Sequence, residues 1–241
     1  MGKKFMRMVL LCFTLAAVLT VGAAATGARI IKNGECGGDL TWTLDEEGTL
    51  TISGTGNMYD YTFWDEGGEL KIAPWWDVHK TVRHSDGEGD WDETVYYPVR
   101  TAVIRSGVTS IGECAFWYCG NLTSVSIPAS VKRVGYSAFN QTSLQTLSIE
   151  SLSAWCEISF ASKDAHPLYY IKKLYIAGKE VTDLKIPDDV TSIGNYAFSG
   201  CTGLTSVTIP DSVTTIGGSA FSGCAKLASV TIPDSVTTIG G

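Results

Sequence analysis

The sequence is poor in the residues and motifs that mark enzymes. It has three histidines in 241 residues, and it contains no His-Glu-x-x-His, no Gly-x-Ser-x-Gly and no phosphate-binding loop. Cys156 and His166 could pair as thiol nucleophile and base, but nothing near them marks an oxyanion hole. Asp188 and Asp189 follow a proline and match turn positions elsewhere in the chain, which is not the arrangement of an acid/base pair. We therefore expect a protein that is not an enzyme and that has no metal site or cofactor.

The chain also lacks a basic cluster after its first 25 residues. Lys3, Lys4 and Arg7 precede an apolar run from Met8 to Val21, and small residues at 23–25 offer a cleavage site, which is the pattern of a secretory signal peptide. Cleavage there changes the formal net charge from −7 to −10, because three of the 18 basic residues are removed. An acidic mature chain disfavours nucleic acid and anionic membranes as partners.

No later hydrophobic run is long enough to cross a bilayer, so we expect no transmembrane span in the mature chain. An uncleaved membrane anchor at residues 1–25 is the alternative. Attachment as a lipoprotein through Cys12 is disfavoured, because Leu11 stands where a small residue is expected. The predicted location is therefore outside the cell, either secreted or on the cell surface.

What the sequence has in abundance is repetition. Residues 204–224 are followed, 23 residues later, by a near copy that begins at Leu227. The steps that recur are Ile127-Pro128, Ile186-Pro187, Ile209-Pro210, Ile232-Pro233, Ala115-Phe116, Ala138-Phe139, Ala197-Phe198 and Ala220-Phe221. A fixed period of this length predicts a solenoid, in which each unit buries its apolar side by stacking on the next. Six coils are expected, beginning near Val99, Leu122, Leu144, Val181, Leu204 and Leu227.

Each unit has the pattern of a strand followed by turns. In the best-preserved copy Ser206 and Thr208 alternate with Val207 and Ile209, and Pro210 ends the strand. The Ala-Phe step predicts a short helical or 3-10 turn on the far side. The alternation predicts an outward sheet surface of short polar side chains, which is the candidate binding face: Ser124, Ser126, Thr146, Ser148, Asp183, Lys185, Ser206, Thr208, Ser229 and Thr231.

The pattern Leu-x-x-Val-x-Ile-Pro-x-Ser-Val-x-x-Ile-Gly-x-x-Ala-Phe-x-x-Cys resembles the BspA-like leucine-rich repeats of secreted and surface proteins. The resemblance covers residues from about 99 to 241, and Cys36–Gly56 and Ala73–Trp75 are similar to the segment that often precedes such repeats. It implies a leucine-rich-repeat solenoid used for adhesion or protein binding, with a parallel β-sheet on one side and turns and short helical or 3-10 segments on the other. It implies no common enzymatic activity.

The chain divides into a signal peptide (1–25), an amino-terminal β-rich cap (26–98) and the repeats (99–241). Ile149 and Ile186 stand 37 residues apart, so one coil carries an insertion of about 14 residues at about 150–180. There, Leu174–Ile186 predicts a hairpin-like excursion whose second strand, near 183–186, rejoins the sheet. The last repeat is incomplete, and it exposes the apolar side of Val230 and Ile232. We therefore expect either a longer array or end-to-end self-association through this repeat.

Ahead of the repeats, Leu40–Leu44 and Thr49–Ser53 alternate in period two around Asp45–Gly48, which predicts a β-hairpin cap. The polar, glycine-rich stretch at 84–90 predicts a loop. Five of the seven tryptophans lie between positions 42 and 91. They form either the core of the cap or an exposed platform for glycans, whose members are Trp64, Trp75, Trp76 and Trp91.

Three cysteines, Cys119, Cys201 and Cys224, share one repeat column. A recurring column is better explained by core packing than by disulfides, because neighbouring members point the same way. The pairing of Cys36, Cys114 and Cys156 stays open.

These patterns favour a secreted or surface-exposed protein that binds a protein or glycan of a host or neighbouring cell without covalent chemistry. One alternative is a carbohydrate-binding module centred on the tryptophan-rich segment. The other is a structural spacer in a larger surface protein.

Overall fold

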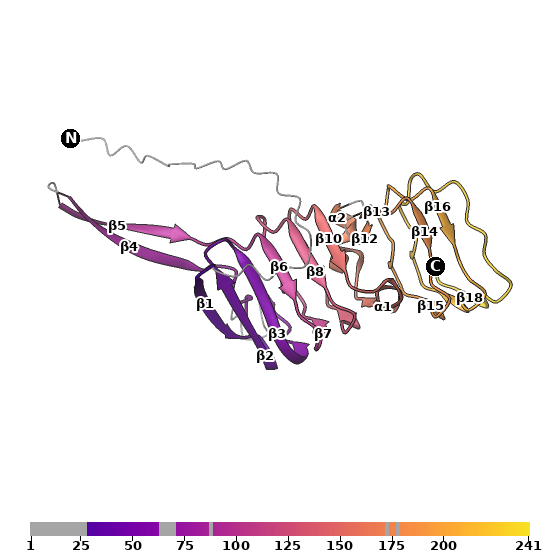
Figure 1. Cartoon of the computed structure of the whole chain (residues 1–241), viewed down its shortest axis with the longest axis horizontal. Helices are drawn as coiled ribbons and strands as arrows, with labels where there is room; N and C mark the ends of the chain where they lie inside the picture. Colours follow the sequence, from indigo (N-terminus) through magenta and orange to yellow (C-terminus); the bar gives the residue numbers. More distant parts are fainter. Residues whose placement is uncertain (1–27, 63–70, 87–88, 172–173, 177–178) are drawn as a thin grey trace.

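The computed structural model describes residues 28–62, 71–86, 89–171, 174–176 and 179–241. The molecule is an elongated solenoid whose coils stack along its long axis (Figure 1). The cap strands lie at one end of the stack and the last repeats at the other. The predicted solenoid is therefore confirmed, while the predicted signal peptide lies outside the described residues.

Three antiparallel strands form the cap: β1 (Ile30–Glu35), β2 (Gly37–Asp45) and β3 (Thr49–Met58). The predicted hairpin is confirmed, with Leu44 paired to Leu50 across β2 and β3. Its turn is held by the Asp45 carboxylate, which accepts hydrogen bonds from the backbone N–H groups of Glu47 and Thr49 at 3.0 and 2.8 Å. Strand β1 has no counterpart in the sequence prediction.

The cap continues the sheet of the repeats. Strand β3 pairs in parallel with β6 (Thr101–Ile104), in a register that places Thr49 beside Thr101 and Ile52 beside Ile104. The cap hairpin thus takes the place of a coil, and it covers apolar side chains of the first repeat that would otherwise face water.

Two ladders of parallel strands run along the solenoid. The first contains β6, β8 (Ser124–Ile127), β10 (Thr146–Ile149), β14 (Asp183–Lys185) and β16 (Ser206–Thr208). The second contains β7 (Val108–Ile111), β9 (Arg133–Val134), β11 (Ser159–Phe160), β15 (Ser192–Ile193), β17 (Thr215–Ile216) and β18 (Thr238–Ile239). The sequence pattern predicted the first ladder only. The turns around the Ala-Phe steps make up the remaining side.

The insertion contributes α1 (Leu152–Cys156), η1 (Lys163–Ala165), α2 (Leu168–Ile171), β12 (Tyr175–Ile176) and β13 (Lys179–Glu180). The hairpin is present, since β12 pairs antiparallel with β13, but its predicted second strand is wrong. The residues predicted for that strand form β14, which pairs in parallel with β16 and starts a new coil. Strands β14 and β16 form a sheet of their own, and so do β15, β17 and β18, so both ladders are interrupted at the insertion.

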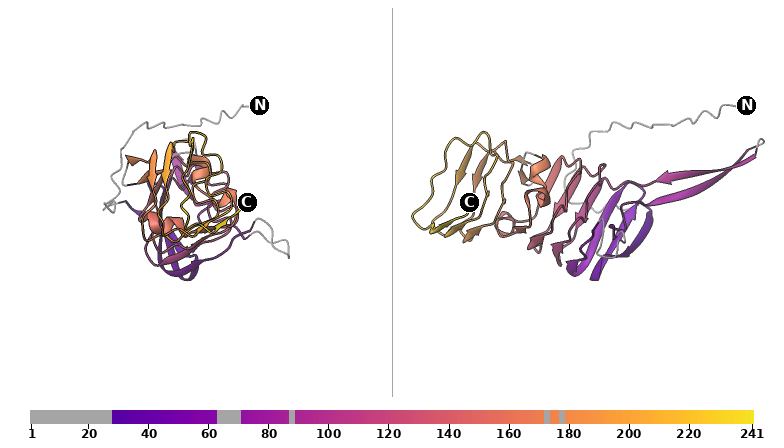
Figure 2. Two further views of the ribbon diagram at one scale, coloured as in Figure 1. Left: turned by 90° about the vertical axis from the view of Figure 1, so that its right-hand side faces the viewer. Right: turned by 180° about the vertical axis from the view of Figure 1, so that it is seen from behind.

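A two-stranded ribbon, β4 (His79–Asp86) and β5 (Gly89–Tyr96), projects from the cap end (Figures 1 and 2). The loop predicted at 84–90 is therefore wrong, because the strands reach Asp86 and resume at Gly89. Polar side chains meet across the ribbon, with Arg83 Nη2 3.0 Å from Asp90 Oδ2 and His84 Nε2 2.8 Å from Glu93 Oε2.

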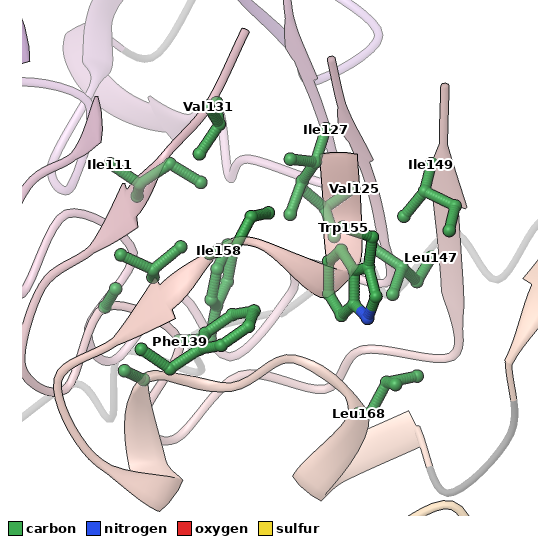
Figure 3. Close-up of a cluster of buried hydrophobic side chains, with 14 of the residues drawn as sticks. Ile111, Val125, Ile127, Val131, Phe139, Leu147, Ile149, Trp155, Ile158 and Leu168 are labelled. Atoms are coloured by element: carbon green, nitrogen blue, oxygen red, sulfur yellow. The ribbon is translucent and has the colours of Figure 1, made fainter. Parts of the chain in front are cut away.

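The core runs through the middle of the coils as far as Cys224. Phenylalanines of the Ala-Phe steps stack on one another, with ring centroids 5.2 Å apart for Phe116 and Phe139 and 5.5 Å apart for Phe198 and Phe221. Between these two stacks lies Trp155 of the insertion, which packs near Leu147 and Leu168 (Figure 3). Buried side chains of the insertion therefore keep the hydrophobic core continuous where the sheet is interrupted.

Candidate functional site

The predicted binding face is an outward surface of the first ladder. Val125, Leu147 and Val207 are buried, whereas the polar residues that alternate with them are half-buried or exposed. Adjacent strands are in register, so that Ser124 lies beside Thr146. All ten predicted residues are half-buried or exposed, and in β8, β10, β14 and β16 they alternate with buried side chains. Around Ser229 and Thr231 the predicted alternation is not kept, because Val230 is half-buried and Ile232 is exposed. The role of these residues in binding stays a prediction. Parallel strands lie about 4.8 Å apart, which makes this a flat surface of closely spaced hydroxyl groups.

This surface extends into the cap. Thr49 and Thr51 of β3 are half-buried beside Thr101 and Val103 of β6. They were missed because their strand was assigned to a separate hairpin, and only the parallel pairing of β3 with β6 adds them to the face. The alternation of Thr49 and Thr51 with buried Leu50 was the available signal.

Charged residues mark the point where the face is interrupted. Asp183 and Lys185 project from β14, and the Ser206 hydroxyl donates a hydrogen bond to the Asp183 carboxylate at 2.6 Å. The face therefore has an amino-terminal part from β3 to β10 that is neutral and carries hydroxyl groups at every outward position except Val103, and a carboxyl-terminal part that begins with a charged strand.

The alternative glycan platform is not formed as predicted. Trp75 is only 1% exposed, whereas its neighbour Trp76 is 41% exposed. The Trp75 ring packs edge-on against Trp42 and Tyr61, with centroids 5.9 and 5.7 Å away. Trp75 is thus a core residue, and its ring centroid also lies 5.8 Å from that of Phe116 in the first Ala-Phe turn.

The other members of the platform are not brought together with Trp76. Trp64 lies outside the described residues. The backbone of Trp91 pairs with that of His84 on the projecting ribbon, and its side chain is also outside the described part.

Cys156 and His166 have the environment of core residues rather than of a nucleophile and base. The Leu168 N–H donates to His166 Nδ1 at 3.1 Å, so the proton is on Nε2, which donates to the Ala197 carbonyl oxygen at 3.0 Å. Burial lowers the pKa of His166 to about 3. Burial, and more weakly the nearby Glu157, raises the pKa of the Cys156 thiol to about 12. The thiol stays protonated and the imidazole stays neutral.

All six cysteines of the described residues are free. Cys119, Cys201 and Cys224 are buried, as the packing interpretation of their column predicted. Cys36 and Cys156 are buried as well, and Cys114 is half-buried. The question left open for these three is answered in favour of free thiols.

Among the residues that the structure describes, no group of three or more histidine, cysteine, aspartate or glutamate side chains is placed to hold a metal ion. No helix in this described part of the chain has the length and apolar character needed to span a membrane.

A repeat solenoid with a flat polar sheet face and a β cap defines a leucine-rich-repeat protein. The family model described as "BspA type Leucine rich repeat region" matches residues 96–174 and 169–241, in six copies. These matches cover more than half of the sequence, and the chain belongs to this family.

Solved structures with some similarity are bacterial leucine-rich-repeat proteins. One from Eubacterium ventriosum is 23% identical over 87% of this chain and 68% of its own, with a TM-score of 0.38. A leucine rich cell surface protein from Faecalibacterium prausnitzii is 21% identical over 90% of this chain, with a TM-score of 0.36, and this chain spans 52% of its length. A leucine-rich-repeat protein of T. pallidum is 24% identical over 66% of this chain and 78% of its own, with a TM-score of 0.37. The curated proteins contain no match.

Proposed function

We propose that this chain is a secreted or surface-exposed binding protein that adheres to a protein or glycan of a host or neighbouring cell. The observation that carries the proposal is the flat hydroxyl face that runs without interruption from β3 of the cap to β10. Short hydroxyl side chains offer many weak contacts and no deep pocket, so affinity is expected to come from area rather than from a few anchors.

The proposed location outside the cell rests on the charged and apolar pattern of residues 1–25 and on membership of the BspA-type family. Expression in a bacterial host that exports proteins tests it. Amino-terminal sequencing of the exported chain should give a start near Thr26. Retention of residues 1–25 in the membrane fraction contradicts cleavage and supports an anchor.

The binding face is tested with two charge-matched double variants. Ser126→Arg with Ser148→Arg places bulky cations on the first ladder, where the two residues are neighbours in register. The control, Thr109→Arg with Ser159→Arg, places the same cations at exposed positions of the second ladder. The probe is the fluorescent mature chain on cultured epithelial cells and on cells of other bacterial species, read by flow cytometry.

The proposal expects staining by the unmodified chain and by the control, and at least tenfold weaker staining by the first-ladder variant. Equal loss in both variants, or loss in the control alone, contradicts the assignment of this face. Absence of staining on every cell type contradicts adhesion and favours the role of a structural spacer.

A further inference from the structure

The turns of this solenoid contain two repeat columns in the left-handed backbone region. One column precedes the Ala-Phe step, and its φ values run from 51° to 62° at Cys114, Ser137, Tyr196 and Ser219. The other follows three residues after the alanine, with φ values of 61°, 59°, 80° and 74° at Tyr118, Gln141, Gly200 and Gly223. In this second column the backbone conformation is therefore the same in all four coils, but the early coils carry large side chains there and the late coils carry glycine.

This change of residue hollows the surface of the late coils. The early turns carry Trp117-Tyr118 and Asn140-Gln141, whereas the late turns carry Ser199-Gly200 and Ser222-Gly223 at the same positions. A groove of about 240 Å³ lies over the late turns. The residues that matter for its chemistry are Lys163, Tyr169, Tyr196, Ser199, Ser219 and Ser222.

The insertion supplies the other wall of the groove. Lys163 comes from η1 and Tyr169 from α2. A Cβ atom built on Gly200 would lie 3.3 Å from the Leu168 carbonyl oxygen and 3.3 Å from the Tyr169 Cα atom, so α2 lies directly against the late turns. The same helix is tied to an early turn, because the Tyr170 hydroxyl donates to Asn140 Oδ1 at 3.2 Å. The wall is therefore held in place before any ligand binds.

The groove places hydrogen-bonding groups beside aromatic rings. Ser199, Ser219 and Ser222 line it, and a serine hydroxyl can both donate and accept a hydrogen bond. Tyr169 and Tyr196 add ring surface, and Lys163 adds an ammonium donor.

A pyranose ring matches this combination, because it presents apolar C–H faces to aromatic rings and hydroxyl groups to serine and lysine. We propose that the groove is a carbohydrate subsite that binds one sugar unit. Its volume lies just below the range of about 300–1,000 Å³ that is usual for small-molecule sites, which limits it to a single ring of a longer glycan. The subsite lies on the turn side and is independent of the hydroxyl face proposed above.

The test measures saturation-transfer NMR of the exported chain with three monosaccharides, N-acetylglucosamine, galactose and N-acetylneuraminic acid. A ligand of this size gives a dissociation constant on the order of 1 mM, so each sugar is offered up to about 10 mM. Saturation transfer to at least one of the three is expected. No transfer to any of them overturns the proposal.

Two variants address the groove itself. Gly223→Gln fills it with the residue that an early coil carries in the same column, at Gln141 with a φ of 59°. A side chain at Gly223, with a φ of 74°, strains the backbone, so the matched control is Gly56→Gln, which also has a positive φ (103°) and meets nothing within 4 Å of an added Cβ atom. Tyr169→Ala removes one ring, and Tyr136→Ala removes an exposed tyrosine that is not part of the groove lining.

Gly223→Gln and Tyr169→Ala should each weaken sugar binding at least tenfold, and both controls should leave it unchanged. Circular dichroism confirms that each variant is folded before titration. If Gly223→Gln does not fold, Ser199→Ala with Ser222→Ala replaces it, and the same loss is expected. Binding that survives all groove variants, or that is lost equally in the controls, overturns the assignment.

Discussion

Trp155 and Trp75, 80 positions apart in the sequence, make the same hydrogen bond in different coils. Trp75 Nε1 donates to the Ala115 carbonyl oxygen at 2.9 Å, and Trp155 Nε1 donates to the Ala197 carbonyl oxygen at 2.9 Å. Within the repeats, the equivalent alanine carbonyls accept from a phenylalanine N–H of the preceding coil, as in the bond from Phe116 to Ala138 at 2.8 Å.

The cap and the insertion have no Ala-Phe step, so they have no phenylalanine N–H that could donate to the alanine carbonyl of the next coil. In both places an indole N–H replaces the missing backbone donor. Ala197 receives a second hydrogen bond, from His166 Nε2 at 3.0 Å, whereas no second donor to the Ala115 carbonyl oxygen is found in the described residues. This difference has a measurable consequence for stability.

Trp75→Phe should destabilise the protein more than Trp155→Phe. Both changes remove the same atoms from a buried site, but only the first leaves the alanine carbonyl without a donor, which costs about 1–3 kcal/mol. Denaturant unfolding of the two variants measures the difference, with an expected gap of about 1 kcal/mol. Trp76→Phe, at an exposed position, serves as control and should change the free energy of unfolding by less than about 0.5 kcal/mol. An equal loss for Trp75→Phe and Trp155→Phe would contradict the role of the second donor.

Stability should fall as the pH drops from about 6.5 towards 3. Burial lowers the pKa of His166 from 6.5 to about 3, so in this range the unfolded chain binds a proton there that the folded chain does not bind. The free energy of unfolding then decreases by about 1.4 kcal/mol per pH unit from this group, and above pH 6.5 its contribution is constant.

The pH dependence is measured by chemical denaturation at several pH values for the unmodified chain and for His166→Gln. Glutamine can keep one donor towards Ala197 but does not titrate, so the variant should be less stable at pH 7 and should have a flatter profile below pH 6.5. Identical profiles would show that His166 is not the group responsible.

All six cysteines of the mature chain should react as free thiols after unfolding and slowly before it. Burial raises the pKa of the Cys119 and Cys156 thiols to about 12, so almost no thiolate is present at pH 8 in the folded state. Cys114 is half-buried and should be labelled first. Maleimide labelling followed by mass spectrometry gives both the rates and the count. A bridge between Cys201 and Cys224 in that experiment would overturn the packing account of their column.

The last repeat should make the chain self-associate end to end. Ile232 and Ile239 are 46% and 59% exposed, although the equivalent isoleucines of the preceding coil, Ile209 and Ile216, are buried. Exposed apolar side chains beside an open strand edge favour pairing with another chain. Light scattering should show a mass that rises with concentration, and Ile239→Lys should lower it. A monomer at all concentrations, for both chains, would exclude this contact.

The sequence alone determined the features that depend on a repeat period or on neighbouring residues. The 23-residue period specified the solenoid, and strict alternation specified which side chains of β8, β10 and β16 face outward. The shared column specified that Cys119, Cys201 and Cys224 pack in the core. The cap hairpin was equally local, because the two strands and the turn at Asp45 are adjacent in the sequence. Repeats and hairpins are predictable because their contacts recur at fixed short separations.

Tertiary structure alone decided where segments without such a period meet. The register of β3 on β6 extends the hydroxyl face into the cap, and it depends on a pairing across about 50 residues. The burial of Trp75 and Trp155 depends on alanine carbonyls 40 and 42 residues further along the chain. The groove beside Tyr169 exists because α2 packs on turns whose side chains are small. Composition and alternation do not indicate these long-range contacts, because a tryptophan or a tyrosine can be either buried or exposed. Only the packing of segments distant in the sequence decides which of the two it is.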